Sequence, residues 1–458
     1  MKVVICGAGQ VGFGIAERLA AEDNDVAIVD FTPKLIQQIT EILDVRGIVG
    51  HGAHPDVLVQ AGIEQADMII AATLYDEVNM VACQVAHSLF NVPTKIARIR
   101  AQSYLEPHWR DLFSNENMPI DVIISPEIEV GEMVLRRLEL PGAFDTVSFA
   151  DGEAVVAGVS CDESCPIVDT PLHQLTDLFP DLKAVVVGIY RAGRLFVPRS
   201  SDQMLVGDIA YFVAARDQVR RTLGIFGHEE REANRVVISG GGNIGLYVAK
   251  ELEKRQRSAK IKLIEQSRAR AIDIADQLDR SVVLHGNALD EDLLREADAS
   301  DADTLVAVTN NDEVNVLSCV LARRLGVPNT MALVNNRAYP DLARSLGISA
   351  HVNPRQITVS KILQHVRRGR IRGVHSIQNG LAEVIEAEAL ETSPLVGRPL
   401  RDIELSDDMR IGAILRNGQL IIPRGDTTVL AHDRVIIFAM QKAVRQVEQM
   451  FRVSIEFF

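Results

Sequence analysis

Residues 1–30 read MKVVICGAGQVGFGIAERLAAEDNDVAIVD. The stretch contains a short apolar run, a glycine turn, a helical segment and a second apolar run that ends in an acid. A G-x-G-x-x-G turn between a strand and a helix, with an acid at the end of the next strand, is typical of nucleotide-binding βαβ units. The opening residues therefore predict a parallel sheet with a nucleotide site at its edge.

The same pattern returns at residues 235–265, RVVISGGGNIGLYVAKELEKRQRSAKIKLIE. The tetrapeptide DEVN also occurs twice, at residues 76–79 and 312–315, at nearly the same spacing from the two glycine turns. Matches this far apart that keep their spacing indicate one folded unit written twice.

Each copy has two parts with different sequence patterns. The first part alternates short β-rich runs with helical segments, which predicts a Rossmann-like, doubly wound parallel sheet of the α/β class. The second part contains RAGRLFVPR at 191–199 or RNGQLIIPR at 416–424. These strand–turn–strand patterns predict a small α/β C-terminal lobe, which we expect to hold a mixed sheet.

The repeat predicts the domain organisation. We expect a first parallel-sheet lobe at residues 1–125, a connecting helix with a C-terminal lobe at 126–226, and a linker at 227–233. A second parallel-sheet lobe is expected at 234–353, and a connecting helix with a C-terminal lobe at 354–458.

Composition narrows the class of protein. The 458 residues are 47% apolar and 24% charged, which favours a globular fold. The net charge of −14 argues against nucleic-acid binding, and the basic run HVRRGRIRG at 365–373 is interpreted as a linker or helix end. We expect no membrane span, a cytoplasmic location, no metal site, and partly buried thiols at Cys161 and Cys165.

The first glycine turn has a chemical interpretation. Gly7 permits the tight turn, Gly9 lets a phosphate reach the backbone, and Gly12 lets the helix pack on the strand. The helix N-terminus attracts a pyrophosphate, and the acid accepts hydrogen bonds from ribose hydroxyls, which favours NAD(H) over NADP(H). ATP, ADP and AMP carry the same groups. The candidate residues of this site are Gly7, Ala8, Gly9, Gln10, Val11, Gly12, Asp30, Thr73, Leu74 and Arg98.

The second copy repeats the fingerprint but lacks an arginine at the position of Arg98, because its matching strand reads ALVNN. Two interpretations stay open: a second nucleotide site that binds differently, or a copy that keeps its glycines for packing. The candidate residues are Gly240, Gly241, Gly242, Asn243, Ile244, Gly245, Glu265, Thr309 and Asn310.

No catalytic residue is predicted. Asp76 and Glu77 can be read as a catalytic acid pair, but acids at a helix start more often cap the first turn, and we favour capping. No His-Asp or Tyr-x-x-x-Lys cluster accompanies the glycine turns. We therefore favour a ligand-responsive switch, and the alternative is an NAD-dependent oxidoreductase.

Several motifs together carry a family resemblance: GAGQVG at 7–12, DEVNM at 76–80, VPTKIARIR at 92–100, and PRGDTTVL with HDRVIIF at 423–438. They resemble the tandem RCK (KTN) domain family of regulatory proteins of bacterial Trk-type potassium uptake. The resemblance covers essentially the whole chain.

That resemblance implies a cytoplasmic regulatory subunit, peripheral on the inner face of the cell membrane. It implies a membrane K+ transporter subunit of the TrkH or TrkG type as partner, and a homo-oligomeric ring of two to four chains. It also implies NAD(H) and ATP/ADP as ligands, held by the candidate residues of the two glycine-turn sites.

Overall fold

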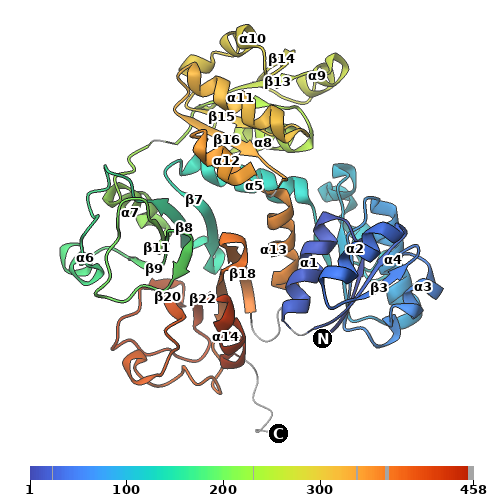
Figure 1. Cartoon of the computed structure of the whole chain (residues 1–458), viewed down its shortest axis with the longest axis horizontal. Helices are drawn as coiled ribbons and strands as arrows, with labels where there is room; N and C mark the ends of the chain where they lie inside the picture. The colour runs from blue at the N-terminus through green and yellow to red at the C-terminus, as the bar shows by residue number, and fades with distance from the viewer. Residues whose placement is uncertain (23, 231, 337–338, 367–370, 452–458) are drawn as a thin grey trace. The chain divides into compact units, whose positions relative to one another are not determined.

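The computed structural model describes residues 1–22, 24–230, 232–336, 339–366 and 371–451 (Figure 1). The chain forms two compact units. The first joins Met1–Val134 with Asn234–His365, and the second joins Leu135–Ala233 with Val366–Phe458. The first unit holds the parallel-sheet part of each copy and the second holds the C-terminal parts. The finer division proposed from the sequence stays a prediction.

The first parallel-sheet lobe (blue in Figure 1) has the strand order β3-β2-β1-β4-β5-β6, and every paired strand in it is parallel. Its short apolar strands are buried because helices cover both faces of such a sheet. The elements are β1 (Lys2–Cys6), α1 (Gln10–Ala21), β2 (Asp25–Asp30), α2 (Pro33–Ile42), β3 (Arg46–Val49), α3 (Pro55–Gln60), β4 (Met68–Ala71), α4 (Asp76–Phe90), β5 (Thr94–Arg98) and β6 (Val122–Ile124).

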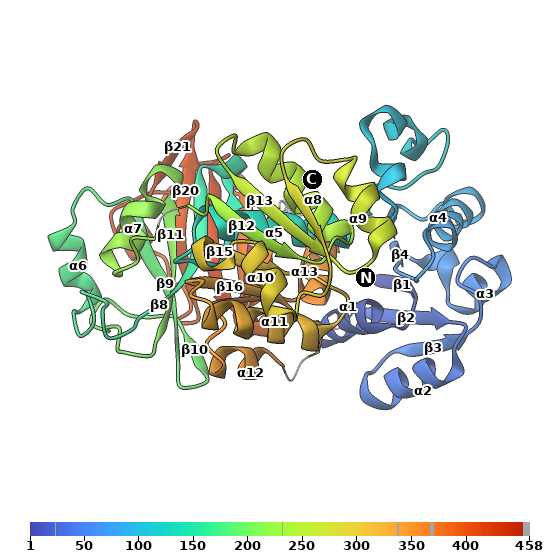
Figure 2. The same ribbon diagram turned by 90° about the horizontal axis from the view of Figure 1, so that it is seen from above.

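The second parallel-sheet lobe repeats this order as β14-β13-β12-β15-β16-β17, and Figure 2 shows β13, β12, β15 and β16 side by side. The doubly wound fold predicted for both copies is confirmed. The elements are β12 (Arg235–Ser239), α8 (Asn243–Arg255), β13 (Lys260–Glu265), α9 (Arg268–Ala275), β14 (Val282–His285), α10 (Glu291–Glu296), β15 (Thr304–Ala307), α11 (Asp312–Arg324), β16 (Asn329–Leu333), α12 (Tyr339–Ser345) and β17 (Ala350–Val352).

A helix beginning at a proline follows each parallel sheet, as the sequence predicts: α5 (Pro126–Glu139) and α13 (Pro354–Val366). Within the first unit these helices contact the opposite copy. Tyr247 of α8 donates its hydroxyl to Glu132 of α5 at 2.7 Å. Arg355 of α13 stacks over the ring of Phe13 in α1, with the guanidinium carbon 5.5 Å from the ring centre.

The two C-terminal lobes share one strand order. Read from one edge the sheets run β7-β8-β11-β9-β10 and β18-β19-β22-β20-β21. A matched ion pair fixes the same corner in each lobe: Arg191–Asp208 at 2.6 Å and Arg416–Asp433 at 2.7 Å. The elements are β7 (Phe144–Phe149), β8 (Ala154–Ser160), α6 (Leu172–Leu178), β9 (Ala184–Arg191), β10 (Arg194–Phe196), β11 (Ile209–Ala215), α7 (Val219–Ile225), β18 (Ile371–Ile377), β19 (Ala382–Glu388), β20 (Met409–Arg416), β21 (Gln419–Ile421), β22 (Arg434–Met440) and α14 (Val444–Met450).

The expectation of a mixed sheet in these lobes is wrong. All strand pairs described in both sheets are antiparallel. Two-residue turns account for two of these pairs, β9 with β10 and β20 with β21, since a tight turn can only join antiparallel neighbours. Between β9 and β10, for example, Ala192 and Gly193 both adopt positive φ, at 46° and 83°.

Burial of the first strand predicts a loss of stability at alkaline pH. Burial raises the pKa of the fully buried Cys6 thiol to about 12, from 9.0 in an unfolded chain. Between these values the folded state keeps a proton that the unfolded state has lost. The stability is therefore complete below pH 9 and declines as pH rises toward 12. We expect this thiol to remove about 2 kcal/mol between pH 9 and 10.5, at about 1.4 kcal/mol per pKa unit.

The measurement is the free energy of unfolding in urea at several pH values for the wild-type chain and for Cys6→Ala. Wild type should be more stable at pH 8, and its advantage should shrink as pH rises. A difference that stays constant from pH 8 to 10.5 would contradict this account.

Candidate functional site

The first glycine turn is closed by backbone packing. Gly7 has φ +109°, and a Cβ there would lie 2.8 Å from the carbonyl oxygen of Ala72. A Cβ at Gly12 would lie 1.8 Å from the carbonyl oxygen of Gly7, whereas one at Gly9 would meet no atom within 4 Å. The turn is therefore tight on its inner side and open at Gly9, where α1 begins, as a phosphate-binding turn requires.

Asp30, at the end of β2, is held against this turn. One carboxylate oxygen accepts the N–H of Ala8 at 2.8 Å, and the other accepts the N–H of Thr32 at 2.8 Å. A carboxylate oxygen can accept more than one hydrogen bond. Both oxygens thus remain able to accept from ribose hydroxyls.

Asn79 of α4 connects the loops that follow β4 and β5. Its side-chain oxygen accepts from the N–H of Thr73 at 2.8 Å and from the Thr73 hydroxyl at 2.7 Å. Its side-chain nitrogen donates to the carbonyl of Arg98 at 2.8 Å. The fully buried amide therefore fixes Thr73 relative to the end of β5. Asn315 makes the same bonds to Thr309 and to the carbonyl of Leu333 in the second copy.

The interpretation of Asp76 as a cap of its own helix is wrong. Its carboxylate accepts the N–H groups of Arg100 and Ala101, at 2.9 and 2.8 Å. Asp312 does the same for Asn335 and Asn336. The parallel sheet makes this possible, because β4 pairs with β5 and the loop after β5 comes within reach of the acid that follows β4. In each copy the acid and the asparagine of the DEVN motif therefore hold neighbouring loops together, and we call this arrangement the loop clip.

Arg98 ends β5 at the same edge of the sheet. Its Nε is buried and has no hydrogen-bond partner among the residues that the structure describes. Burial, followed by the neighbouring charge of Arg100, lowers the pKa of the Arg98 guanidinium. Arg100 is itself paired with Glu127 at 2.8 Å. A half-buried cation with a buried, unused donor fits an anionic ligand.

The second glycine turn has the same backbone geometry. Gly240 has φ +107°, and a Cβ there would lie 2.9 Å from the backbone nitrogen of Thr309. Glu265 accepts the N–H of Gly241 at 2.8 Å and that of Ser267 at 2.7 Å. Leu333 ends the strand that matches β5, so the cation of the first site is absent at this position.

The structure brings most of the predicted residues together. Gly7 packs on Thr73, Asn79 ties Thr73 to Arg98, and Asp30 holds Ala8. Leu74 lies in the loop after β4 and is 68% exposed. The remaining predicted residues lie in the turns, at the first residues of α1 and α8, and after β15: Gln10, Val11, Gly242, Asn243, Ile244, Gly245 and Asn310.

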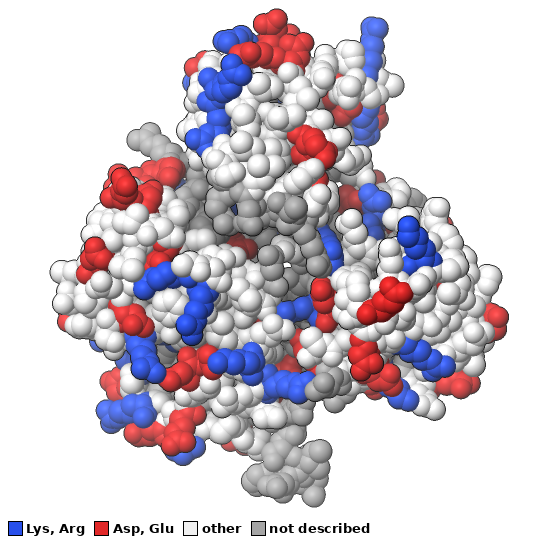
Figure 3. Space-filling view, viewed as in Figure 1, with Lys and Arg blue, Asp and Glu red and all other residues white. Residues whose placement is uncertain are grey.

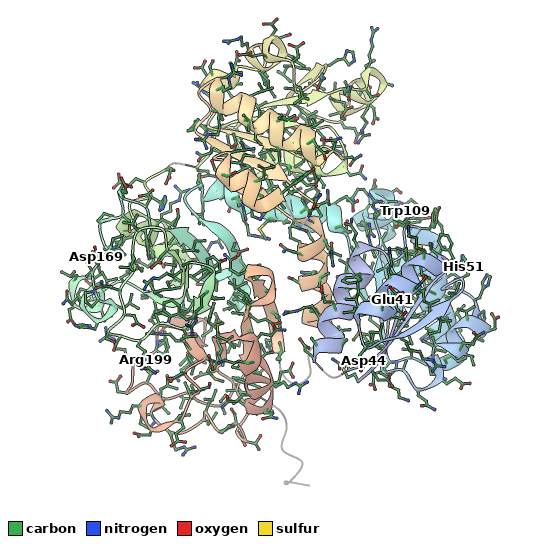
Figure 4. All side chains as sticks on the ribbon, in the orientation of Figure 1. Glu41, Asp44, His51, Trp109, Asp169 and Arg199 are labelled. Carbon is green, nitrogen blue, oxygen red and sulfur yellow. The ribbon has the colours of Figure 1, made fainter. Side chains whose placement is uncertain are left out.

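Sequence reasoning missed two functional candidates, Asn79 and Asn315. The two asparagines stand six residues after a threonine in both copies, and that repeat could have revealed them. His51, labelled in Figure 4, lies in the loop after β3, and its ring stacks on that of His54 with the ring centres 4.5 Å apart. Nothing in this contact assigns acid–base chemistry to the pair.

Other expectations concern the rest of the chain. Cys161 and Cys165 are free thiols, and both are buried more fully than expected. Among the described residues no His, Cys, Asp and Glu cluster suits a metal ion, and no helix has the length and apolarity needed to cross a bilayer. On the face seen in Figure 3, acidic and basic side chains are interspersed. Residues 367–370 of the basic run lie outside the described residues.

The comparisons with known proteins agree with this arrangement. A TrkA-N domain model matches residues 3–126 and 236–354, and a TrkA-C domain model matches residues 384–452. The Trk system potassium uptake protein TrkA of Azorhizobium caulinodans is 68% identical over 458 residues, which cover all of both chains. That name describes a potassium uptake system and no enzymatic reaction, in agreement with the non-enzymatic prediction.

Two solved structures share the fold. The GsuK channel bound to NAD has a TM-score of 0.61 at 17% identity, covering 98% of this chain and 78% of the other. GsuK bound to ADP has a TM-score of 0.50 at 15% identity, covering 80% and 70%. Because the family models match more than half of the chain and the curated relative matches all of it, the chain belongs to the family of Trk system potassium uptake proteins TrkA.

Proposed function

We propose that the chain is a cytoplasmic regulatory subunit of a Trk-type potassium uptake system. It binds NAD(H), ATP or ADP at its glycine turns and changes the conductance of a membrane K+-translocating subunit of the TrkH or TrkG type. It acts as a homo-oligomeric ring of two to four chains, peripheral on the inner face of the membrane. Family membership supports the potassium system as the setting.

One observation carries the ligand class. The buried, unpartnered Nε of Arg98 lies at the sheet edge where Asp30 presents a fixed carboxylate and Gly9 leaves the start of α1 open. An anion satisfies the arginine and the helix N-terminus, and hydroxyls satisfy the carboxylate. A ribose joined to phosphate carries both. NAD and ADP, named for the GsuK structures, have this chemistry.

The contacts between the copies support a conformational response. A Cβ at Gly131 of α5 would lie 2.3 Å from the Tyr247 ring of α8, so α5 packs closely on the helix that begins at the second glycine turn. In the same way α13 lies against α1, since a Cβ at Gly14 would be 3.0 Å from Val359. A nucleotide that shifts α1 therefore acts on α13 of the second copy, and a nucleotide that shifts α8 acts on α5 of the first copy. A ligand moves the equilibrium only by binding one conformation more tightly.

The test measures nucleotide affinity and K+ flux on the same preparation. The full chain is titrated with NAD, NADH, ATP and ADP by calorimetry, and flux is followed in liposomes holding the membrane subunit. Arg98→Ala should weaken ATP and ADP about tenfold, the effect of one charged hydrogen bond. It should also shift the nucleotide concentration that changes the flux by the same factor.

Arg46→Ala is the matched control, because it removes an exposed arginine at the amino end of β3, at the opposite edge of the sheet. Its affinity and flux should equal those of wild type. Weaker nucleotide binding by Arg98→Ala with an unchanged flux response to every nucleotide would refute the coupling. A wild-type chain that binds no adenine nucleotide would refute the ligand class.

A further inference from the structure

The two glycine-turn sites place their arginines at different positions. The first has Arg98 at the end of β5, where the second has Leu333. The second has Arg270 in the first turn of α9, five residues after Glu265. The residue five positions after Asp30 in the first copy is Leu35. Each site thus has a cation where the other has a leucine.

Arg270 contacts the second turn directly. Its Nε donates to the carbonyl of Gly241 at 3.1 Å, and its Nη1 pairs with Asp273. Glu265 accepts the N–H of the same glycine. A carboxylate and a guanidinium therefore flank one residue of the turn. The Nη2 of Arg270 has no hydrogen-bond partner among the described residues.

The neighbourhood of Glu265 defines which part of a ligand Arg270 meets. A carboxylate at the end of the second strand binds the ribose of the adenosine half, so a cation beside it lies next to adenosine. A planar guanidinium can stack on an aromatic ring and donate from its edge. In the first lobe β1 and β4 lie between β2 and β5. Arg98, at the end of β5, is therefore on the side of the phosphates that are farthest from the adenosine.

We propose that Arg270 is a specificity-determining residue of the second site, where it holds the adenosine half of the nucleotide. This rests on the nucleotide binding proposed above. The second site binds AMP about as tightly as ATP. The first site, which relies on Arg98, loses affinity as phosphates are removed. One chain thus combines a site whose affinity depends on the number of phosphates with a site whose affinity depends mainly on adenosine.

Calorimetric titration of the full chain with AMP and with ATP tests this proposal. Wild type should bind ATP at two sites and AMP at one. Arg270→Ala should weaken AMP and ATP about tenfold each at one site, the effect expected of one charged contact. Arg98→Ala should weaken ATP at the other site and leave AMP binding unchanged. Unfolding temperatures of both variants verify that they fold.

A second variant keeps the proposal testable if Arg270→Ala does not fold. The double substitution Leu35→Arg with Gln38→Asp transplants the Arg270–Asp273 pair into the first copy, and it should raise AMP affinity there about tenfold. AMP binding that is unchanged in both variants, or a loss of ATP binding alone in Arg270→Ala, would overturn the assignment. A wild-type chain that binds neither AMP nor ATP would instead overturn the proposed function itself.

Discussion

Replacing Gly9 by alanine is expected to abolish nucleotide binding at the first glycine turn and to leave the lobe folded. The residue has ordinary dihedral angles, φ −68° and ψ −172°, and a Cβ there meets no atom within 4 Å. The new methyl group fits the chain but fills the space through which a phosphate reaches the N–H groups of α1. We expect at least a hundredfold weaker binding of ATP and NADH at one site, about 2.8 kcal/mol at about 1.4 kcal/mol per tenfold.

Gly12→Ala is the contrasting variant. Its Cβ would lie 1.8 Å from the carbonyl oxygen of Gly7, so the turn must move, and we expect a loss of about 3 kcal/mol in stability. The second copy offers the same comparison, since a Cβ at Gly242 meets nothing within 4 Å and one at Gly245 lies 2.0 Å from Gly240. Calorimetry and thermal unfolding separate the two effects. Unchanged nucleotide affinity in Gly9→Ala would mean that no phosphate lies on this turn.

Sequence alone predicted the features that depend on local chemistry repeated in both copies. The order of strand, glycine turn, helix and acid identified both parallel sheets because each piece is specified within about 30 residues. For the same reason, prolines at the start of α5 and α13 identified the helices that follow the two parallel sheets. The antiparallel C-terminal sheets were missed because the order of strands in a sheet depends on pairings distant in sequence.

The remaining features depend on contacts that no short motif contains. Asp76 reaches the N–H groups of a loop 24 residues later, so its role emerges only when β4 and β5 are adjacent. The packing of α5 on α8 joins residues 115 positions apart. One compensation could have been read from the sequence. Copy one has Ala8 beside Asp30, whereas copy two has Gly241 beside the longer Glu265. A Cβ at Gly241 would lie 2.9 Å from a carboxylate oxygen of Glu265, so the longer acid is matched by the smaller residue.

Replacing Asn79 by alanine is expected to weaken both stability and nucleotide binding of the first lobe. The substitution removes every bond that ties Thr73 to the end of β5, and it leaves the N–H of Thr73 and the carbonyl of Arg98 without their partner. Each buried polar group left unsatisfied costs about 1–3 kcal/mol, so we expect a loss of about 3 kcal/mol. Because the backbone of Arg98 is no longer fixed, ATP affinity should also fall about tenfold.

Hydrogen exchange locates the change and calorimetry measures the affinity. Amides of the loop after β4 and of β5 should exchange faster in Asn79→Ala, whereas those of the second lobe should not change. Asn315→Ala should show the reverse pattern, because it breaks the matching bonds to Thr309 and Leu333. Glu77→Ala is the neighbouring control, since this acid is exposed and the described bonds of the clip do not involve it. Equal stability of Asn79→Ala and Glu77→Ala would show that the clip does not hold the site, and the link between the threonine loop and the arginine would have to be abandoned.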